Sequence, residues 1–443
     1  MIPVSDTIVA IATAAGRSGI GVVRVSGPGV CEWQHPLFGR LLPPRRALLC
    51  TLRDEHGEAI DQVVALYFAA PASYTGEDVL ELHGHGNPVI LQAIVQRCVQ
   101  LGARLARPGE FTERAFLNDK IDLAQAESVA DLIDAGSIEA ARCAMRSLEG
   151  EFSRLIGQLA QELLELRIQV ESMLDFPEEV PEYLHALRIV ERLQSLLQRL
   201  RQIEQAGRQG SLLREGIQVV LIGQPNVGKS SLLNRLAGNE RAIVTDIAGT
   251  TRDTLRETIV LHGITLHIID TAGLRDTSDP IEKIGIERTW QAIGHATLAL
   301  LLVDARQGIT AADQAIIDRL PPGLPQLLVH NKCDLPGADA MASTAGVSVS
   351  ARTGHGLDVL QQRLFELAGW RGNTEGIYMA RERQLQALQA TQHHVTQALD
   401  QLAIAEWVAE ELRLAHIALS AITGAVSADD LLGEIFSRFC IGK

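Results

Sequence analysis

The stretch that decides the fold is Ile217–Leu233, IQVVLIGQPNVGKSSLL. Its apolar run Val219–Ile222 predicts a buried strand, Gly223 ends that strand, and Ser230 begins a predicted helix. The segment between them fits the phosphate-binding loop pattern, with the strand and the helix in the required places. Glycines in such a loop let backbone N–H groups converge on anionic oxygens beside the positive end of the helix dipole. The sequence therefore predicts a nucleotide site here, and a glycine-rich turn that binds nothing is the weaker alternative.

Three later segments fall where a guanine-nucleotide domain needs them, each after a predicted strand. Asp270 is expected to join the Mg²⁺ shell, and the Gly273 N–H to sense the γ-phosphate. Asp334 is expected to accept both N–H groups of the guanine edge, which adenine lacks. The residues expected to contact GTP here and in the phosphate loop are Asn226, Val227, Gly228, Lys229, Ser230, Ser231, Asp270, Thr271, Ala272, Gly273, Asn331, Lys332, Asp334, Ser350, Ala351 and Arg352.

The segment 245–253, TDIAGTTRD, lies between the phosphate loop and the Asp270 strand and is interpreted as the first switch loop. Thr251 is expected to be the second Mg²⁺ ligand beside Ser230, and Lys229 to reach the β- and γ-phosphates. A threonine-rich surface turn is the alternative. The GTP contacts expected in this loop are Thr245, Asp246, Ile247, Ala248, Gly249, Thr250 and Thr251.

Leu274 follows Gly273, where Ras-like enzymes place the glutamine that orients the attacking water. Leucine forms no hydrogen bond to water, so a nearby carboxylate is expected to take that role. Glu282 and Asp279 are the candidates, and a solvated charge is the favoured interpretation of Asp279. Charge on the γ-phosphate also needs neutralising, either by an arginine finger or by a cation. For a cation, the Asn226 side-chain oxygen is expected to help hold a monovalent ion beside the phosphates, with carbonyl groups of the 245–250 loop completing its shell.

The bulk properties bound the class of protein. The chain has 443 residues, which indicates about three domains, and its formal charge of −14 argues against a uniformly basic surface. Any nucleic acid must therefore dock on a local basic patch. The six cysteines contain no CxxC pair, which is typical of a reduced, cytoplasmic protein without structural zinc. No secretory leader is recognised, and no segment is apolar enough to predict a membrane span.

The pattern along the chain predicts a multidomain fold that combines α/β and all-α parts. Strands are expected at 6–13, 21–26, 62–68 and 78–83, and a helix at 87–101, while 30–46 resists assignment. Apolar residues from Met145 to Met173 predict one long helix, and Gly207–Gly210 predicts a linker. Residues 216–370 alternate strand and helix, as in a mainly parallel sheet covered on both faces, and helices return after Gly372. Ser427–Asp430 is a capping signal for a last short helix.

These patterns favour a domain inserted into a helical bundle. The predicted division is an N-terminal α/β domain at 1–120, a helical domain at 121–212 and 373–443, and a Ras-like P-loop GTPase domain at 213–372. Such an inserted domain is well placed to transmit its own rearrangement to the helices that carry it.

The sequence strongly resembles the MnmE (TrmE) family of tRNA modification GTPases over nearly the whole chain. The nucleotide motifs at 223–231, 246–253 and 270–275 carry part of this resemblance. More specific are TGEDVLELH at 75–83, RPGEFTERAFLN at 107–118, DFPEE at 175–179 and the terminal CIGK at 440–443. The segment 29–46 looks shortened and departs from the family pattern.

The resemblance implies a K⁺-stimulated GTP hydrolase that modifies carbon 5 of the wobble uridine of certain tRNAs, in an aminomethyl-type addition. It implies a homodimer, a flavin-dependent partner of the MnmG (GidA) family in a heterotetramer, and a one-carbon donor of the 5-formyltetrahydrofolate type. Glu282 would position the attacking water. Asn226, Thr245, Ile247 and Thr250 would hold K⁺, Ser230 and Thr251 would hold Mg²⁺, and Arg24, Glu81, Lys120 and Lys443 would contact the folate.

Other interpretations stay open. Arg24 and Glu81 are alternatively an internal ion pair on neighbouring strands. His83 and His85 lack further ligands for a metal, so a turn is favoured there. The rival function is a GTP-switched ribosome-assembly factor, although no GXXG loop in a basic setting appears. A scaffold whose bundle binds partner helices without chemistry is a third hypothesis.

Overall fold

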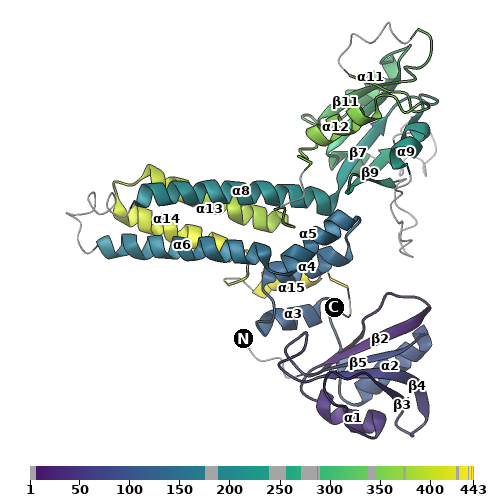
Figure 1. The fold of residues 1–443 in the computed structure, drawn as a ribbon, viewed down its shortest axis with the longest axis vertical. Coiled ribbons are helices and arrows are strands. Elements are labelled where there is room, and N and C mark those ends of the chain that lie inside the picture. The colour runs from purple at the N-terminus through teal and green to yellow at the C-terminus, as the bar shows by residue number, and fades with distance from the viewer. Residues whose placement is uncertain are drawn as a thin grey trace. The chain divides into compact units, whose positions relative to one another are not determined.

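The computed structural model describes residues 6–174, 188–238, 256–270, 287, 290–337, 346–372, 376–425, 429–437, 439, 440 and 442. Packing divides the chain into two compact units. The first comprises Met1–Ala130, Leu148–Leu164 and His416–Lys443, and the second comprises Asp131–Ser147 and Glu165–Ala415. Figure 1 shows the elements of both.

The first unit is built on a six-stranded sheet in the order β3-β4-β5-β2-β1-β6, antiparallel except for the β1–β6 pair. Its strands are β1 (Ile8–Ile11), β2 (Ser18–Ser26), β3 (Leu48–Arg53), β4 (Ala59–Phe68), β5 (Val79–Gly86) and β6 (Arg104–Leu105). Its helices are α1 (Val30–Phe38), α2 (Pro88–Gln100), α3 (Glu110–Leu117), α4 (Leu123–Ile133) and α15 (Asp429–Ser437), with α4 continuing past the unit's boundary.

One face of this sheet carries the core. Strand residues alternate between faces, so Val23, Val25 and Leu82 point into the core that α1 and α2 complete. Arg24 and Glu81 therefore lie on the opposite face, directly across from each other in the β2–β5 register. The four predicted strands and the predicted helix at 87–101 are confirmed. The unassigned segment 30–46 contains α1, and β3 escaped prediction.

The second unit joins a helical bundle to a second six-stranded sheet in the order β12-β11-β10-β7-β9-β8. The helices of the bundle and its junction are α5 (Ile138–Leu148), α6 (Glu151–Met173), α8 (Ile189–Glu215), α13 (Glu382–Asp400) and α14 (Ala405–Ser420). Residues of α5, α6 and α14 beyond the boundaries given above belong to the first unit. The sheet and its helices are β7 (Ile217–Ile222), α9 (Lys229–Ala237), β8 (Arg256–Leu261), β9 (Ile264–Asp270), β10 (Leu298–Asp304), α11 (Ala311–Ile317), β11 (Gln326–Asn331), β12 (Val347–Ser348) and α12 (Leu357–Leu367).

Polar pairs join neighbouring helices of the bundle in this unit. Arg192 on α8 donates to Gln169 on α6 at 2.8 Å, and the His394 ring on α13 lies 2.7 Å from a Glu411 oxygen on α14. Gln389 on α13 donates to Glu204 on α8 at 2.9 Å. Apolar residues of α8 and α13 are buried. The predicted amphipathic stripes therefore serve packing.

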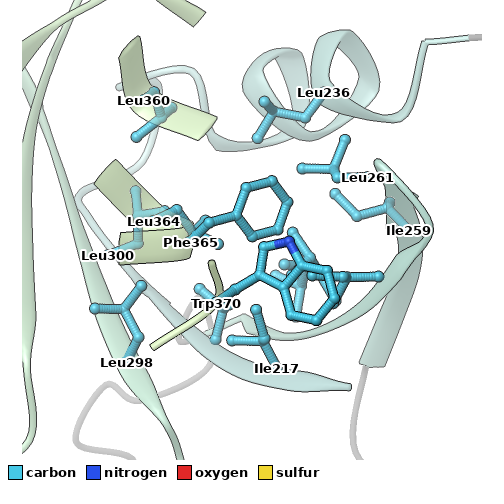
Figure 2. Packing of buried hydrophobic residues seen from close by; sticks show 14 of the residues in the cluster. Ile217, Leu236, Ile259, Leu261, Leu298, Leu300, Leu360, Leu364, Phe365 and Trp370 are labelled. Atoms are coloured by element: carbon cyan, nitrogen blue, oxygen red, sulfur yellow. The ribbon is translucent and has the colours of Figure 1, made fainter. Parts of the chain in front are cut away.

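The second sheet is mainly parallel, as predicted, because only β8 runs antiparallel. Figure 2 shows one of its faces, where Phe365 and Trp370 pack among Ile217, Ile259, Leu261 and Leu298. A separate core that includes Val220, Ile269 and Leu301 covers the other face. Both faces are thus buried, which explains the continuous apolar runs of these strands.

The expected single helix from Met145 to Met173 is wrong. The chain breaks between α5 and α6, where Gly150 has φ +81°. This left-handed conformation ends a helix and favours glycine. The apolar pattern continued across the break because each helix buries its own face, and on α5 that face includes Cys143 while Met145 is 41% exposed.

The expected linker at Gly207–Gly210 is also wrong, because α8 runs through it without interruption. A β-carbon at Gly210 would lie 1.8 Å from the Tyr378 carbonyl oxygen, and one at Gly207 would lie 2.9 Å from the Ala380 β-carbon. The two glycines let the chain that returns to α13 approach the helix backbone closely. The two glycines therefore mark close packing of α8 against residues 378–380, and not a linker.

Candidate nucleotide site

The phosphate loop runs from the end of β7 to the start of α9. A β-carbon at Gly223 would lie 2.5 Å from the Leu302 carbonyl oxygen on the neighbouring strand β10, so only glycine fits. Gly228 has φ +100° and precedes α9, and the Lys229 Nζ donates to the Gly223 carbonyl at 3.0 Å. Ser230 and Ser231 are exposed in the first turn of α9, whose leading N–H groups have no partner within the helix. This arrangement suits an anion.

The segment Asn331–Asp334 is tied directly to the phosphate loop. Asn331 Nδ2 donates to the Val227 carbonyl at 2.7 Å, and Lys332 Nζ donates to the Asn226 carbonyl at 2.6 Å. Asn226 and Lys332 have φ +66° and φ +64°, so both turns are fixed in a left-handed conformation. Asp334 is exposed and has no hydrogen bond or ion pair with another described residue. Its carboxylate is therefore available to a ligand.

The loop after β12 joins the same site. Asn331 Oδ1 accepts the Ala351 N–H at 3.0 Å, while the buried Ser350 side chain accepts the Thr353 N–H at 3.1 Å. Arg352 is exposed. Asn331 thus connects three loops, because its amide donates to one and accepts from another. Parallel strands bring these loops together, since their carboxyl ends share one edge of the sheet.

Asp270 ends β9 beside Leu221 of β7, which places it at the same edge. Twelve predicted site residues lie outside the described residues: Thr245, Asp246, Ile247, Ala248, Gly249, Thr250, Thr251, Thr271, Ala272, Gly273, Glu282 and Lys443. Leu274, Asp279 and Ser427 lie outside them too.

Sequence reasoning missed Asp304, which ends β10 at the same edge. Its carboxylate is buried and accepts from Arg306 Nε at 2.9 Å, Arg306 Nη2 at 2.8 Å and Lys332 Nζ at 3.1 Å. The hydrogen bonds from Arg306 hold the pKa of Asp304 well below its usual value. Burial alone would raise this pKa, and the contact with Lys332 lowers it further. The signal was present in the sequence, because Asp304 directly follows the apolar run Leu298–Val303.

Three of the predicted folate residues, Arg24, Glu81 and Lys120, lie among the described residues of the first unit. Arg24 Nε donates to Glu81 Oε1 at 2.9 Å, and the Arg24 guanidinium lies over the rings of Tyr74 and Phe111. Lys120 Nζ donates to the Pro71 carbonyl at 3.1 Å, in the same loop as Tyr74. Arg24 and Glu81 thus form the ion pair that was the alternative interpretation. The paired side chains remain partly exposed.

The turn expected at His83 and His85 is wrong, because both belong to β5. The His83 ring lies 3.2 Å from Glu81, and the His85 ring lies 2.7 Å from Asp61. Within the described residues, no group of three or more His, Cys, Asp or Glu side chains is placed to hold a metal ion. Among the described helices, none has the length and apolar character that crossing a membrane requires.

A phosphate loop on the first strand of a parallel sheet, joined to an Asn-Lys-Cys-Asp loop, defines the class of P-loop guanine-nucleotide-binding proteins. A family model described as the MnmE helical domain matches residues 123–440, and one described as the GTP-binding protein TrmE N-terminus matches residues 7–120. These two matches together span both units.

Curated relatives named tRNA modification GTPase MnmE match the chain from end to end. The protein from Chromobacterium violaceum is 56% identical over 99% of this chain and 98% of its own length. The protein from Thiobacillus denitrificans is 55% identical over 100% of this chain and 99% of its own length. A crystal structure of Aquifex aeolicus Era bound to GDP.AlF4- is 28% identical over 40% of this chain and 66% of that one, with a TM-score of 0.28, too low to bear on the fold. The chain belongs to the MnmE family of tRNA modification GTPases.

Proposed function

We propose that this chain binds and hydrolyses GTP and that it acts in tRNA modification. The observation that carries the proposal is the pair of hydrogen bonds from Asn331 to the Val227 carbonyl and from Lys332 to the Asn226 carbonyl. They hold a base-recognition loop against a phosphate loop at one edge of the sheet. A nucleotide whose base reaches Asp334 therefore has its phosphates at the start of α9.

The described residues suit guanine and Mg²⁺. The exposed Asp334 carboxylate is available to accept two N–H groups, and the exposed Ser230 hydroxyl stands at the first turn of α9. We propose that Ser230 and Thr251 hold Mg²⁺, with Asp270 in its outer shell. The cation would neutralise charge on the β- and γ-phosphates.

Hydrolysis is proposed to depend on Glu282 and on K⁺. Leu274 supplies no hydrogen bond to the attacking water, so Glu282 is assigned that role. Asn226, Thr245, Ile247 and Thr250 are proposed as the K⁺ ligands, and Asn226 is exposed within the phosphate loop with φ +66°. A bound K⁺ would add positive charge next to the γ-phosphate.

The tRNA chemistry is proposed from family membership. The curated relatives are named for tRNA modification. We propose that the modified atom is carbon 5 of the wobble uridine, that a flavin-dependent protein of the MnmG family is the partner, and that both work in the cytoplasm. The proposed assembly is a heterotetramer built on a homodimer.

A folate is proposed as the one-carbon donor, with Arg24, Glu81, Lys120 and Lys443 as its contacts. The Arg24–Glu81 pair and the Tyr74 ring together offer charge, hydrogen-bond acceptors and an aromatic surface to a planar ligand. Calorimetric titration of 5-formyltetrahydrofolate into wild type and Arg24→Ala tests this. Wild-type binding that is lost in Arg24→Ala would support the site. If the wild type gives no heat of binding, Arg24 and Glu81 form only an internal ion pair.

The domain division also remains a proposal: 1–120, a helical domain from 121–212 and 373–443, and an inserted nucleotide domain at 213–372. Two observations support it. The chain enters β7 straight from α8 and returns through residues 376–381 to α13, and α8 packs against α13. The nucleotide domain is therefore attached to the bundle through two adjacent helices.

Steady-state GTP turnover tests the proposed hydrolysis. We expect turnover in K⁺ to exceed turnover in Na⁺ sharply. Glu282→Ala should lower kcat about a hundredfold or more while GDP affinity stays nearly unchanged. Asp279→Ala is the matched comparison, since it removes a carboxylate three residues away and should keep most activity. Equal rates in both salts would remove the K⁺ proposal, and an equal loss of binding and turnover would make Glu282 structural.

A further inference from the structure

Lys332 is held by two groups that belong to different elements. Its Nζ donates to the Asn226 carbonyl in the phosphate loop at 2.6 Å and to Asp304 Oδ2 at the end of β10 at 3.1 Å. Lys332 itself sits in a left-handed turn with φ +64°. Because an ammonium donates three bonds at most, two fixed acceptors determine where the side chain lies.

Asp304 is itself held in place independently of Lys332. Its Oδ1 accepts the Arg306 backbone N–H at 3.0 Å and Arg306 Nε at 2.9 Å, and its Oδ2 accepts Arg306 Nη2 at 2.8 Å. The side chain is only 5% exposed, and Asp304 is paired with Asn331 in the β10–β11 register. A rigid strand end therefore presents one fixed carboxylate oxygen to Lys332.

We propose that Asp304 is a positioning residue for guanine-nucleotide binding, acting through Lys332. The carboxylate anchors the Lys332 ammonium, which in turn holds the base-recognition loop against the Asn226 carbonyl of the phosphate loop. The inference rests on the proposed function, because it concerns the same nucleotide. It assigns a role to Asp304 and Arg306, which belong neither to the phosphate loop nor to the Asn331–Asp334 motif.

The geometry separates this contact from the second tether. The Asn331 side chain bonds to the Val227 carbonyl and the Ala351 N–H, and neither of these two hydrogen bonds involves the Asp304 carboxylate. Loss of the Asp304 carboxylate should thus leave the two loops joined through Asn331, and only the Lys332 side chain should lose an anchor. We expect weakened binding in a folded protein.

The test is a fluorescence titration of the full-length chain with a fluorescent GDP analogue. Asp304→Asn keeps the size of the side chain and removes its charge, and it should weaken binding about tenfold, as expected for a lost charge-assisted hydrogen bond. Asp318→Asn is the control, since it removes the same charge from an exposed position at the end of α11 and should bind as wild type does.

A double-mutant cycle with Lys332→Met decides whether Asp304 acts through Lys332. If it does, Asp304→Asn should change affinity less than about twofold in the Lys332→Met background. Additive losses would show that Asp304 supports the fold instead and would overturn the inference. If Asp304→Asn gives no cooperative thermal transition, Lys332→Met alone decides, because wild-type affinity of that variant also overturns it.

The two proposals fail in different ways. A wild-type chain with no affinity for the GDP analogue would refute the proposed function. Wild-type binding that Asp304→Asn leaves unchanged would refute only the role of Asp304.

Discussion

Asp334 is the residue whose chemistry is proposed to choose the base. The proposed contact uses two acceptor oxygens for the two N–H groups that guanine presents on one edge. Asparagine at this position would offer one acceptor and one donor. That pattern suits xanthine, which keeps one N–H group and replaces the amino group with a carbonyl oxygen.

We therefore expect Asp334→Asn to lose affinity for GDP by about a hundredfold or more and to gain affinity for xanthosine diphosphate. Asp358→Asn removes the same charge from an exposed position in the first turn of α12 and serves as the control. Competition titrations with both nucleotides measure the exchange. A variant that loses GDP without gaining the xanthosine nucleotide would show that Asp334 shapes the loop and does not read the base.

Motif spacing predicted much of this site because those residues act through backbone turns that need particular residue types. Gly223 and Gly228 are required by neighbouring atoms, and Asn331 by three loops at once. Asp304 was not predicted, because its proposed role depends on the Lys332 side chain, which follows the neighbouring strand β11. A strand end followed by a charge is common, and only the register of β10 with β11 brings it to Lys332.

At the scale of elements, glycine marks two opposite situations. Gly150 ends a helix with φ +81°, whereas Gly210 lies inside α8 under the Tyr378 carbonyl. From composition alone, both glycines would be predicted to interrupt a helix. The apolar period predicted where helices lie, but their ends depended on backbone conformation and on chain that approaches from far along the sequence.

The close approach at Gly210 gives a stability prediction. Gly210→Ala should destabilise the protein by about 3 kcal/mol, because the added methyl group would overlap the Tyr378 backbone oxygen. A backbone atom cannot move aside as the end of a flexible side chain can. Gly157→Ala is the matched helix substitution, since no atom would lie within 4 Å of the methyl group added there, and it should stabilise α6 by about 1 kcal/mol. Thermal unfolding followed by circular dichroism compares them. Equal midpoints would contradict the packing described for α8.

Helix α3 carries a pH-dependent contribution. Burial alone would raise the pKa of Glu110, but hydrogen bonds from Arg104, the Arg107 N–H and Arg114 outweigh it and lower the pKa to about 2. The folded state therefore favours the ionised carboxylate. This contribution of about 3 kcal/mol is complete above the unfolded value near 4.5 and is lost as the pH falls toward 2.

Glu110→Gln should remove that slope from a plot of unfolding free energy against pH between about 5 and 2. Glu113 provides the contrast on the same helix, because burial raises its pKa and gives its contribution the opposite sign. Glu113→Gln should therefore leave the acid-induced loss in place. Indistinguishable pH profiles for the two variants would contradict the assignment to Glu110.

At the scale of the molecule, the chain enters and leaves the nucleotide domain through α8 and the segment before α13. Asp131 on α4 pairs with Arg381 at 2.8 Å, just before α13, and lies 3.9 Å from Arg214 near the end of α8. Entry and exit are thus held by one carboxylate. If GTP binds as proposed, a rearrangement around its γ-phosphate would have a short path to these two helices.

Nucleotide binding at the phosphate loop is proposed to drive tRNA modification. Gly228→Ala tests it within the cell, since a β-carbon there would lie 2.4 Å from Asn331 Nδ2 and would need φ +100°. Gly294→Ala is the matched control in the same domain, where an added β-carbon would meet no other side chain or distant backbone within 4 Å.

The decisive measurement is mass spectrometry of tRNA nucleosides from cells that carry each variant as their sole copy of the gene. We expect carbon-5-modified wobble uridine with wild type and with Gly294→Ala, and its loss with Gly228→Ala and with the deletion. Undiminished modification with Gly228→Ala, or in the deletion strain, would contradict this role of the phosphate loop.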